Sequence, residues 1–221
     1  MMSVRFLIPV MGAILVMAGC SDMKNEVEAP ASVEGRRTVI VHGYMARPDS
    51  HWFPWLAEQL EERGQSTAIL ELPSPDAPDA EAWKQTIMGG LSGADEQTFV
   101  VAHSLGTIST LRALNDLPDD TKIGGLVLVS GFSETLETIP ALDGFLEDGV
   151  DLERAASRFG DCVVITARDD EIVPPELSER LAEGLDCKIH VLESGGHFLG
   201  SDGHTSLPLV LEEVLRLQAR N

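Results

Sequence analysis

The chain has 221 residues, 36 of them acidic and 16 basic, which gives a formal charge of −20. This length suits one domain with a sizeable core. So acidic a surface repels phosphate backbones, which argues against nucleic-acid partners, and it offers no polybasic route to anionic lipid.

The N-terminal segment differs in composition from the rest of the chain. Arg5 precedes an apolar run, Phe6–Ala18, that is too short for a comfortable bilayer span. A charged start, a short apolar run and small residues after it are typical of a secretory signal. The stretch Val16–Cys20, VMAGC, resembles a bacterial lipobox, in which the cysteine becomes the lipidated first residue. We expect residues 1–19 to be a lipoprotein-type signal peptide with Cys20 as the lipidation site; an ordinary secretory signal and an uncleaved anchor are the alternatives.

Residues 20–36 are polar and lack hydrophobic periodicity, which is typical of a flexible tether. We expect this tether to hold a domain of residues 37–221 near a membrane. The predicted location is the cell envelope, with the domain lipid-anchored and facing the periplasm or the exterior. A monomer is the expected oligomeric state.

From residue 37 onward, predicted strands alternate with predicted helices. Continuous apolar runs, typical of strands buried on both faces, predict strands at residues 38–43, 66–72, 98–103, 125–130, 162–167 and 187–192. Apolar residues at helical spacing predict helices near residues 50–63, 80–91, 104–114, 174–185 and 208–217. This alternation indicates an α/β fold: a six-stranded, mostly parallel sheet with helices on both faces. In such sheets ligands bind beyond the carboxyl ends of the strands.

A serine stands directly after the third predicted strand, in the sequence AHSLG. Ala102 and Gly106, two places to either side of Ser104, are small enough to permit a sharp strand-to-helix turn that exposes the hydroxyl. The N–H groups at the start of the helix can stabilise an oxyanion. Ser104 is therefore the predicted nucleophile, although a serine before a helix is also a common N-cap.

A serine nucleophile needs a base and a carboxylate that orients the base. Asp169 and Asp170 follow the fifth predicted strand, and His197 follows the sixth. The order Ser, Asp, His is that of the α/β-hydrolases. His204 also follows the sixth strand and is the alternative base.

The loop after the first strand is the expected source of a second oxyanion donor. We predict the backbone N–H groups of Leu105 and Tyr44 as the two donors. His51, which opens the first helix, is expected to be exposed rather than catalytic. The histidines and cysteines lack the close spacing of metal ligands, and no glycine-rich phosphate or dinucleotide fingerprint is present. Neither a metal nor a cofactor is expected.

Two cysteines, Cys162 and Cys187, open neighbouring predicted strands. In an oxidising compartment they could form a disulfide. Two buried free thiols are an equally good interpretation of the sequence. A Cα separation above about 7 Å would exclude the bridge.

Five segments together resemble a known group: VHGYMARPDSHWFPWL, LPSPDAPDAEAW, VAHSLGTISTLRAL, DDEIVP and GGHFL. Over residues 38–217 the chain is similar to the small serine hydrolases of the YdeN and retinoblastoma-binding-protein-nine type. The resemblance implies a compact α/β-hydrolase fold, with Ser104 as nucleophile and His197 as base. The family's Asp-x-x-hydrophobic-Pro pattern falls on residues 170–174 and favours Asp170 over Asp169. The chain departs from the family at Ala102, where glycine is usual, and in its lipoprotein-like export signal.

These features predict a serine hydrolase, specifically a carboxylesterase that acts on small-molecule acyl esters through a Ser-His-Asp triad and an acyl-enzyme. Thioester and amide cleavage are the chemical alternatives. A non-catalytic binding protein of the same fold at the cell envelope is the alternative from another class. Residues 131–160 take the position of a cap, and so short a cap suggests an open site.

Overall fold

The computed structural model describes residues 1–2 and 35–220. Cys20, the predicted signal peptide beyond Met2 and the predicted tether up to residue 34 lie outside the described residues. Residues 35–220 belong to one compact unit. None of the helices in this part of the chain combines the length and the apolar character that crossing a bilayer requires.

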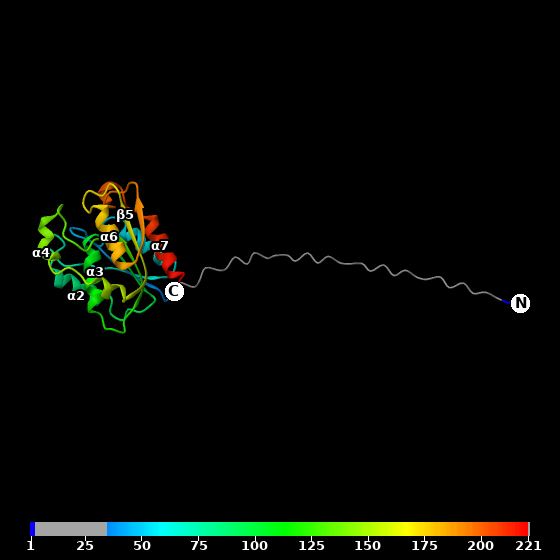
Figure 1. The fold of residues 1–221 in the computed structure, drawn as a ribbon. Helices are drawn as coiled ribbons and strands as arrows, with labels where there is room; N and C mark the ends of the chain where they lie inside the picture. Colours follow the sequence, from blue (N-terminus) through cyan, green and yellow to red (C-terminus); the bar gives the residue numbers. More distant parts are fainter. Residues whose placement is uncertain (3–34, 221) are drawn as a thin grey trace. The chain divides into compact units, whose positions relative to one another are not determined.

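A single sheet forms the centre of this unit (Figure 1). Its order is β2-β1-β3-β4-β5-β6, and every neighbouring pair is parallel. The strands are β1 (Arg37–Val41), β2 (Ser66–Ile69), β3 (Thr98–His103), β4 (Ile123–Val129), β5 (Phe159–Ala167) and β6 (Lys188–Leu192). Every residue of β3 and β4 is buried, because both strands are covered by helices on their two faces. The predicted α/β sheet is thus confirmed, and its described strands are all parallel.

Helices cover both faces of the sheet. On one side lie α1 (Phe53–Glu61) and α7 (Pro208–Gln218), which contact each other. On the other side lie α2 (Ala80–Gly90), α3 (Leu105–Asp116), α5 (Leu152–Ala156) and α6 (Pro175–Leu185). Two short 3₁₀ turns, Pro140–Leu142 and Gly200–Asp202, and the single-turn helix α4 (Asp143–Leu146) complete the described elements.

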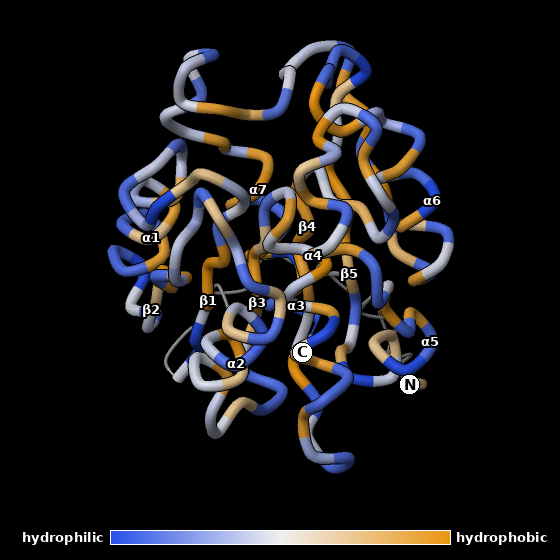
Figure 2. Tube along the Cα trace, turned by 90° about the vertical axis from the view of Figure 1, so that its left-hand side faces the viewer, coloured by the Kyte–Doolittle hydropathy of each residue, from blue (hydrophilic) through white to orange (hydrophobic). Residues whose placement is uncertain are grey.

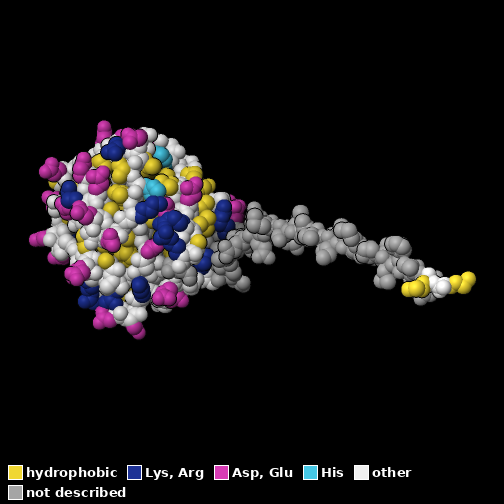
Figure 3. Space-filling view, turned by 45° about the vertical axis from the view of Figure 1, so that its right-hand side comes forward, with side chains coloured by type: hydrophobic (Ala, Val, Ile, Leu, Met, Phe, Trp, Pro, Cys, Tyr) yellow, Lys and Arg dark blue, Asp and Glu magenta, His cyan; other side chains and the backbone are white. Residues whose placement is uncertain are grey.

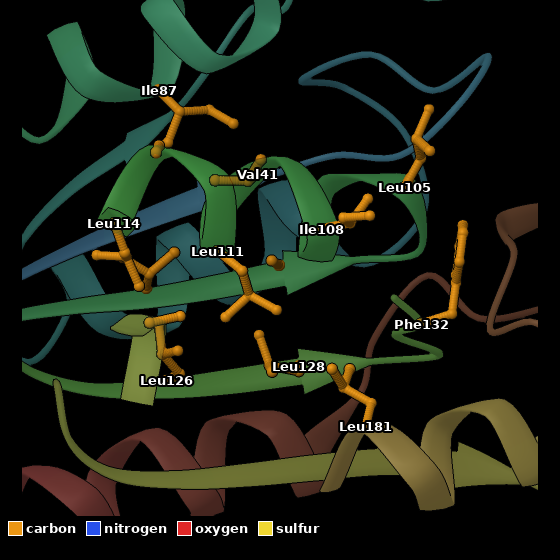
Figure 4. Close-up of a cluster of buried hydrophobic side chains, with 14 of the residues drawn as sticks. Val41, Ile87, Leu105, Ile108, Leu111, Leu114, Leu126, Leu128, Phe132 and Leu181 are labelled. Atoms are coloured by element: carbon orange, nitrogen blue, oxygen red, sulfur yellow. The ribbon is translucent and has the colours of Figure 1, made fainter. Parts of the chain in front are cut away.

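Two apolar clusters fill the space between the sheet and its helices, one on each face. Successive residues of β3 alternate between them: Val100 belongs to the first cluster, and Phe99 and Val101 belong to the second. The strands form the apolar centre of the molecule, with hydrophilic segments around it (Figure 2). Acidic side chains are spread over the surface seen in Figure 3, as the net charge requires. In the first cluster, Leu111 of α3 points toward Leu128 of β4 (Figure 4).

The segment between β4 and β5, predicted to be a short cap, is closely packed against the domain. Its apolar side chains are buried: Phe132, Leu136, Leu142, Phe145 and Leu146. The guanidinium of Arg112, from α3, donates hydrogen bonds of 2.7 Å to the carbonyl oxygens of Phe145 and Gly149. The segment is therefore part of the core as well as a wall at the carboxyl end of the sheet.

Cys162 in β5 and Cys187, which precedes β6, are joined by a disulfide in the structure, with their Cα atoms 4.9 Å apart. This separation lies well inside the range that a disulfide allows. The bond ties together the starts of the two strands whose far ends carry Asp170 and His197.

Candidate active site

The turn between β3 and α3 holds Ser104 in a strained conformation, with φ 54° and ψ −125°. A non-glycine residue seldom occupies this region, and such strain concentrates at functional sites. The Ser104 N–H donates a 2.9 Å hydrogen bond to the carbonyl of Val129. A Cβ at Gly106 would stand 2.4 Å from the carbonyl oxygen of His42, so only glycine fits there. This geometry is that of a nucleophile elbow.

Two backbone N–H groups beside Ser104 are available to a ligand. Within the described residues, neither Leu105 N–H, at the first position of α3, nor Tyr44 N–H donates a backbone hydrogen bond. Gly43 brings the Tyr44 loop close, because a Cβ on Gly43 would lie 2.8 Å from the Ser104 Cβ. The next N–H, that of Met45, is occupied by the carbonyl of Pro75 at 2.8 Å. The two free donors are those that an oxyanion hole at this position needs.

Asp170 is fully buried and is held on every side by donors. His197 Nδ1 donates to its Oδ2 at 2.8 Å, and the Ser130 hydroxyl donates to the same oxygen at 2.8 Å. Its Oδ1 accepts from the backbone N–H groups of Ile172 at 3.0 Å and Val173 at 2.9 Å. Since a carboxylate only accepts, the Nδ1 atom of His197 carries the proton, which leaves Nε2 as the basic nitrogen.

Asp169, the alternative carboxylate, binds backbone N–H groups and not a histidine ring. Its Oδ1 accepts hydrogen bonds from the backbone N–H groups of Gly195 at 2.9 Å and Gly196 at 2.8 Å. Gly196 has a φ of +51°, so the loop turns sharply there. The adjacent aspartates thus hold different parts of one loop: Asp169 holds its backbone and Asp170 holds the ring of His197.

His204, the alternative base, is directed elsewhere. Its ring lies edge-on against Phe198, with centroids 5.4 Å apart. Among the described residues, Asp170 pairs with His197 and not with His204. The arrangement therefore favours His197 as the histidine at this site.

His103 links the His197 loop to the serine turn. It is fully buried, and its Nε2 donates a 2.9 Å hydrogen bond to the backbone carbonyl of His197. The two rings lie 4.9 Å apart. Burial, and secondarily the neighbouring His197, hold the pKa of His103 well below 6.5. A neutral His103 immediately before Ser104 thus ties the backbone of His197 to the Ser104 turn.

Two further histidines buttress the site. Burial lowers the pKa of His42, whose Nδ1 donates to the Gly43 carbonyl at 2.9 Å and whose Nε2 accepts from the N–H of Leu72 at 3.2 Å. His51 is half-buried rather than exposed as expected, and its Nδ1 accepts from the N–H of Gly200 at 2.9 Å. Burial and then the neighbouring His197 lower the pKa of His51. Both neutral rings therefore act as fixed hydrogen-bonding groups.

Some of these contacts were not anticipated from the sequence. Ser130 directly follows β4, so the rule that ligands gather at strand ends could have singled it out. The backbone role of Asp169 left no pattern in the sequence. Within residues 1–2 and 35–220, no group of three or more His, Cys, Asp or Glu side chains is placed to hold a metal ion.

Known structures share this fold. The crystal structure of the ydeN gene product from Bacillus subtilis superposes with a TM-score of 0.80 at 37% identity, covering 82% of this chain and 98% of that one. Est1E from Butyrivibrio proteoclasticus, solved with ferulic acid bound, superposes with a TM-score of 0.66 at 17% identity, covering 85% and 90% of the two chains. At that identity the second likeness concerns the fold, which is that of the α/β-hydrolases.

Sequence comparison gives the family. YdeN of Bacillus subtilis (strain 168) is 38% identical over 177 residues, which are 80% of this chain and 93% of the relative. The serine hydrolase RBBP9 of Rattus norvegicus is 22% identical over 161 residues, 72% and 84% of the two chains. The model of the family described as serine hydrolase matches residues 38–216. This chain therefore belongs to the serine hydrolase family and is a hydrolase.

Proposed function

We propose that this hydrolase is a carboxylesterase that cleaves small acyl esters through Ser104, His197 and Asp170. One observation carries the proposal. The buried carboxylate of Asp170 orients the imidazole of His197. The side chain of His103 holds the backbone of the His197 loop, and the residue that follows His103 is Ser104, which lies on a strained turn. Such a set of groups suits acyl transfer to a hydroxyl nucleophile.

In the first half-reaction, the Ser104 Oγ attacks the acyl carbon while His197 Nε2 takes its proton. The carbonyl oxygen becomes an oxyanion and accepts hydrogen bonds from the N–H groups of Leu105 and Tyr44. Asp170 keeps its bond to the Nδ1 proton and stabilises the imidazolium that forms. When the tetrahedral intermediate collapses, the C–O bond breaks and His197 gives the proton to the departing alcohol.

In the second half-reaction, water attacks the acyl-serine and gives its proton to His197. Collapse of the second intermediate releases the carboxylic acid, and His197 returns the proton to Ser104. The alcohol leaves with the proton of Ser104, and Ser104 regains a proton from the attacking water, so the cycle balances with water as the co-substrate and needs no cofactor. Esters are the proposed substrates over amides because alkoxide leaving groups need less assistance than amines do.

Covalent labelling with a fluorophosphonate probe tests this proposal on the full chain. Wild type should be labelled, Ser104→Ala should not, and His197→Ala should label much more slowly. Ser92→Ala, an exposed serine, and His204→Ala, the alternative base, are the matched controls and should label like wild type. A folded wild-type chain that takes no label would overturn the proposal, and loss of labelling in His204→Ala alone would move the base to His204.

We also propose that residues 1–19 direct export, that Cys20 is lipidated, and that residues 20–36 tether a monomeric domain at the cell envelope. The lipobox-like sequence supports this, and a disulfide between Cys162 and Cys187 fits an oxidising compartment. Metabolic labelling with palmitate should mark wild type but not Cys20→Ala, and the variant should leave the membrane fraction. Equal labelling of the two would contradict lipidation at Cys20.

A further inference from the structure

A cavity of about 330 Å³ lies beside Tyr44, whose backbone N–H is one of the two free donors described above. Tyr44 lines it from the loop after β1, Ala77 and Pro78 line it from the loop before α2, and Leu142 and Phe145 line it from the segment between β4 and β5. Its size falls within the range of small-molecule pockets. Three separate segments thus meet at a hollow that shares Tyr44 with the proposed oxyanion hole.

The cavity and the proposed base lie on opposite sides of the sheet. Leu142 and Phe145 belong to the apolar cluster under α2 and α3, and Tyr44 packs against that cluster. Phe198, which follows His197, belongs to the cluster on the other face. Ser104, at the end of β3 in the middle of the sheet, therefore stands between the base and the cavity.

This placement orients an ester at the site. The general acid must reach the leaving oxygen, so the alcohol part of the substrate lies on the His197 side. The acyl part then extends from Ser104 toward the opposite side, where the cavity is. Building on the proposed function, we propose that this cavity is the acyl-binding site and that it selects uncharged acyl groups longer than acetyl.

The lining explains the selection. Asp76, which is exposed at the cavity, is the one charged side chain among the described residues that line it, and the other side chains are mostly apolar. An acyl chain ending in a carboxylate would lose hydration there without gaining a cation, and it would be repelled by Asp76. An alkyl or aryl chain instead gains apolar contacts with Leu142 and Phe145.

Chain-length selectivity of the full chain tests the position of the cavity. For wild type, kcat/KM on p-nitrophenyl hexanoate should exceed that on p-nitrophenyl acetate. Ala77→Trp, which fills the cavity, should lower the hexanoate-to-acetate ratio of kcat/KM by at least about tenfold. Ala141→Trp places the same side chain on another lining position and covers the case in which Ala77→Trp does not fold. Ala219→Trp, an exposed alanine at the end of α7, is the matched control and should leave the ratio unchanged.

Charge selectivity tests the chemistry of the lining. The mono-p-nitrophenyl ester of adipic acid carries a carboxylate at the end of a chain of hexanoyl length. Its kcat/KM should be at least about tenfold below that of p-nitrophenyl hexanoate. In Asp76→Lys, the hexanoate-to-adipate ratio of kcat/KM should fall at least about threefold. Asp120→Lys makes the same charge change on an exposed loop between α3 and β4 and should not lower this ratio.

The possible failures are distinguishable. If wild type hydrolyses these esters but both tryptophan variants keep the wild-type ratio, the acyl-site inference is wrong and the esterase proposal stands. If Asp76→Lys and Asp120→Lys lower the hexanoate-to-adipate ratio of kcat/KM equally, the discrimination comes from the overall negative charge of the protein, and the role given to Asp76 is wrong. If wild type hydrolyses no ester and takes no fluorophosphonate label, the proposed function fails, and this inference fails with it.

Discussion

The domain contains two buried carboxylates that each accept a hydrogen bond from a histidine at β6 or in the loop that follows it. Asp170 accepts from His197 at 2.8 Å, and Glu213 of α7 accepts from His190 of β6 at 2.6 Å. Glu213 also pairs with Lys188 at 2.8 Å and with Arg216. Asp170, in contrast, has no Lys or Arg partner among the described residues, and its other donors are a hydroxyl and two N–H groups.

This difference separates the carboxylate proposed as catalytic from a structural one. The charge of Glu213 is already balanced by two cations, Lys188 and Arg216. The charge of Asp170 is balanced only by dipoles, so it is available to stabilise a cation that appears on His197 during a reaction. A carboxylate–histidine contact alone therefore does not mark an active site, and the missing permanent cation is the informative feature.

Matched amide substitutions of Asp170 and Glu213 should give the largest difference between the two carboxylates. Asp170→Asn should lower kcat on p-nitrophenyl esters by roughly 10³–10⁴-fold, because an amide neither fixes the Nδ1 tautomer nor stabilises the imidazolium. Glu213→Gln, the matched change, should leave kcat within about twofold. Steady-state kinetics with active-site titration measure both effects, and a loss below tenfold in Asp170→Asn would place the orienting carboxylate elsewhere.

The disulfide beside the Glu213 cluster should affect stability and not turnover. The cross-linked cysteines are 25 residues apart in sequence, and a loop of that length contributes about 3 kcal/mol to the free energy of unfolding. Cys162→Ser combined with Cys187→Ser should lose this amount in urea unfolding, and wild type with a reductant should match the double variant. Identical unfolding of oxidised and reduced wild type would show that the thiols are not bonded.

Glu213→Gln should itself lower the free energy of unfolding by about 2 kcal/mol at pH 7, since charge-assisted hydrogen bonds are lost. Although burial raises the pKa of Glu213, hydrogen bonds from Lys188, Arg216 and His190 lower it from 4.5 to about 2. A lowered pKa contributes stability that is present above pH 4.5 and is lost as the pH falls toward 2. Urea unfolding at several pH values should show the two proteins converging below about pH 4.5, and equal stability at pH 7 would contradict the role given to Glu213.

The sequence predicted the sheet well because local patterns determine its strands. Apolar runs placed all six strands, and the predicted and observed bounds of β3 coincide at residues 98–103. The short helices α4 and α5 were not predicted, because four or five residues are too few to show a helical periodicity. For the candidate site, the ends of the predicted strands indicated Ser104, His197 and the pair Asp169 and Asp170, and only the family resemblance favoured Asp170 within that pair.

Contacts between distant segments could not be predicted, because they depend on strand order and side-chain rotamers. Ser130 donates to Asp170 across 40 residues of sequence, and His103 donates to the His197 carbonyl across 94. The order β3-β4-β5-β6 brings these residues together, and no local pattern encodes that order. For the same reason, the sequence did not predict that Glu213 of α7 pairs with Lys188 and His190 of β6.

Asp169 gives the smallest expected effect, because it is an exposed carboxylate that holds the backbone of the His197 loop and, within residues 35–220, makes no hydrogen bond to a histidine ring. Asp169→Ala removes the acceptor for the N–H groups of Gly195 and Gly196, so His197 should sample more positions. We expect kcat to fall about tenfold with KM nearly unchanged, since a loosened base affects the chemical step more than substrate binding.

Asp169→Asn keeps an oxygen acceptor at the same place and should restore most of the wild-type kcat. This rescue separates positioning from charge: if Asp169 acted through its negative charge on His197, the asparagine variant would be as slow as the alanine variant and the pH profile of kcat/KM would shift in both. If the pH profile of kcat/KM is unshifted and asparagine restores kcat, the two neighbouring aspartates hold the His197 loop through different interactions. Asp169 would act through hydrogen-bond geometry alone, and Asp170 through geometry and charge together.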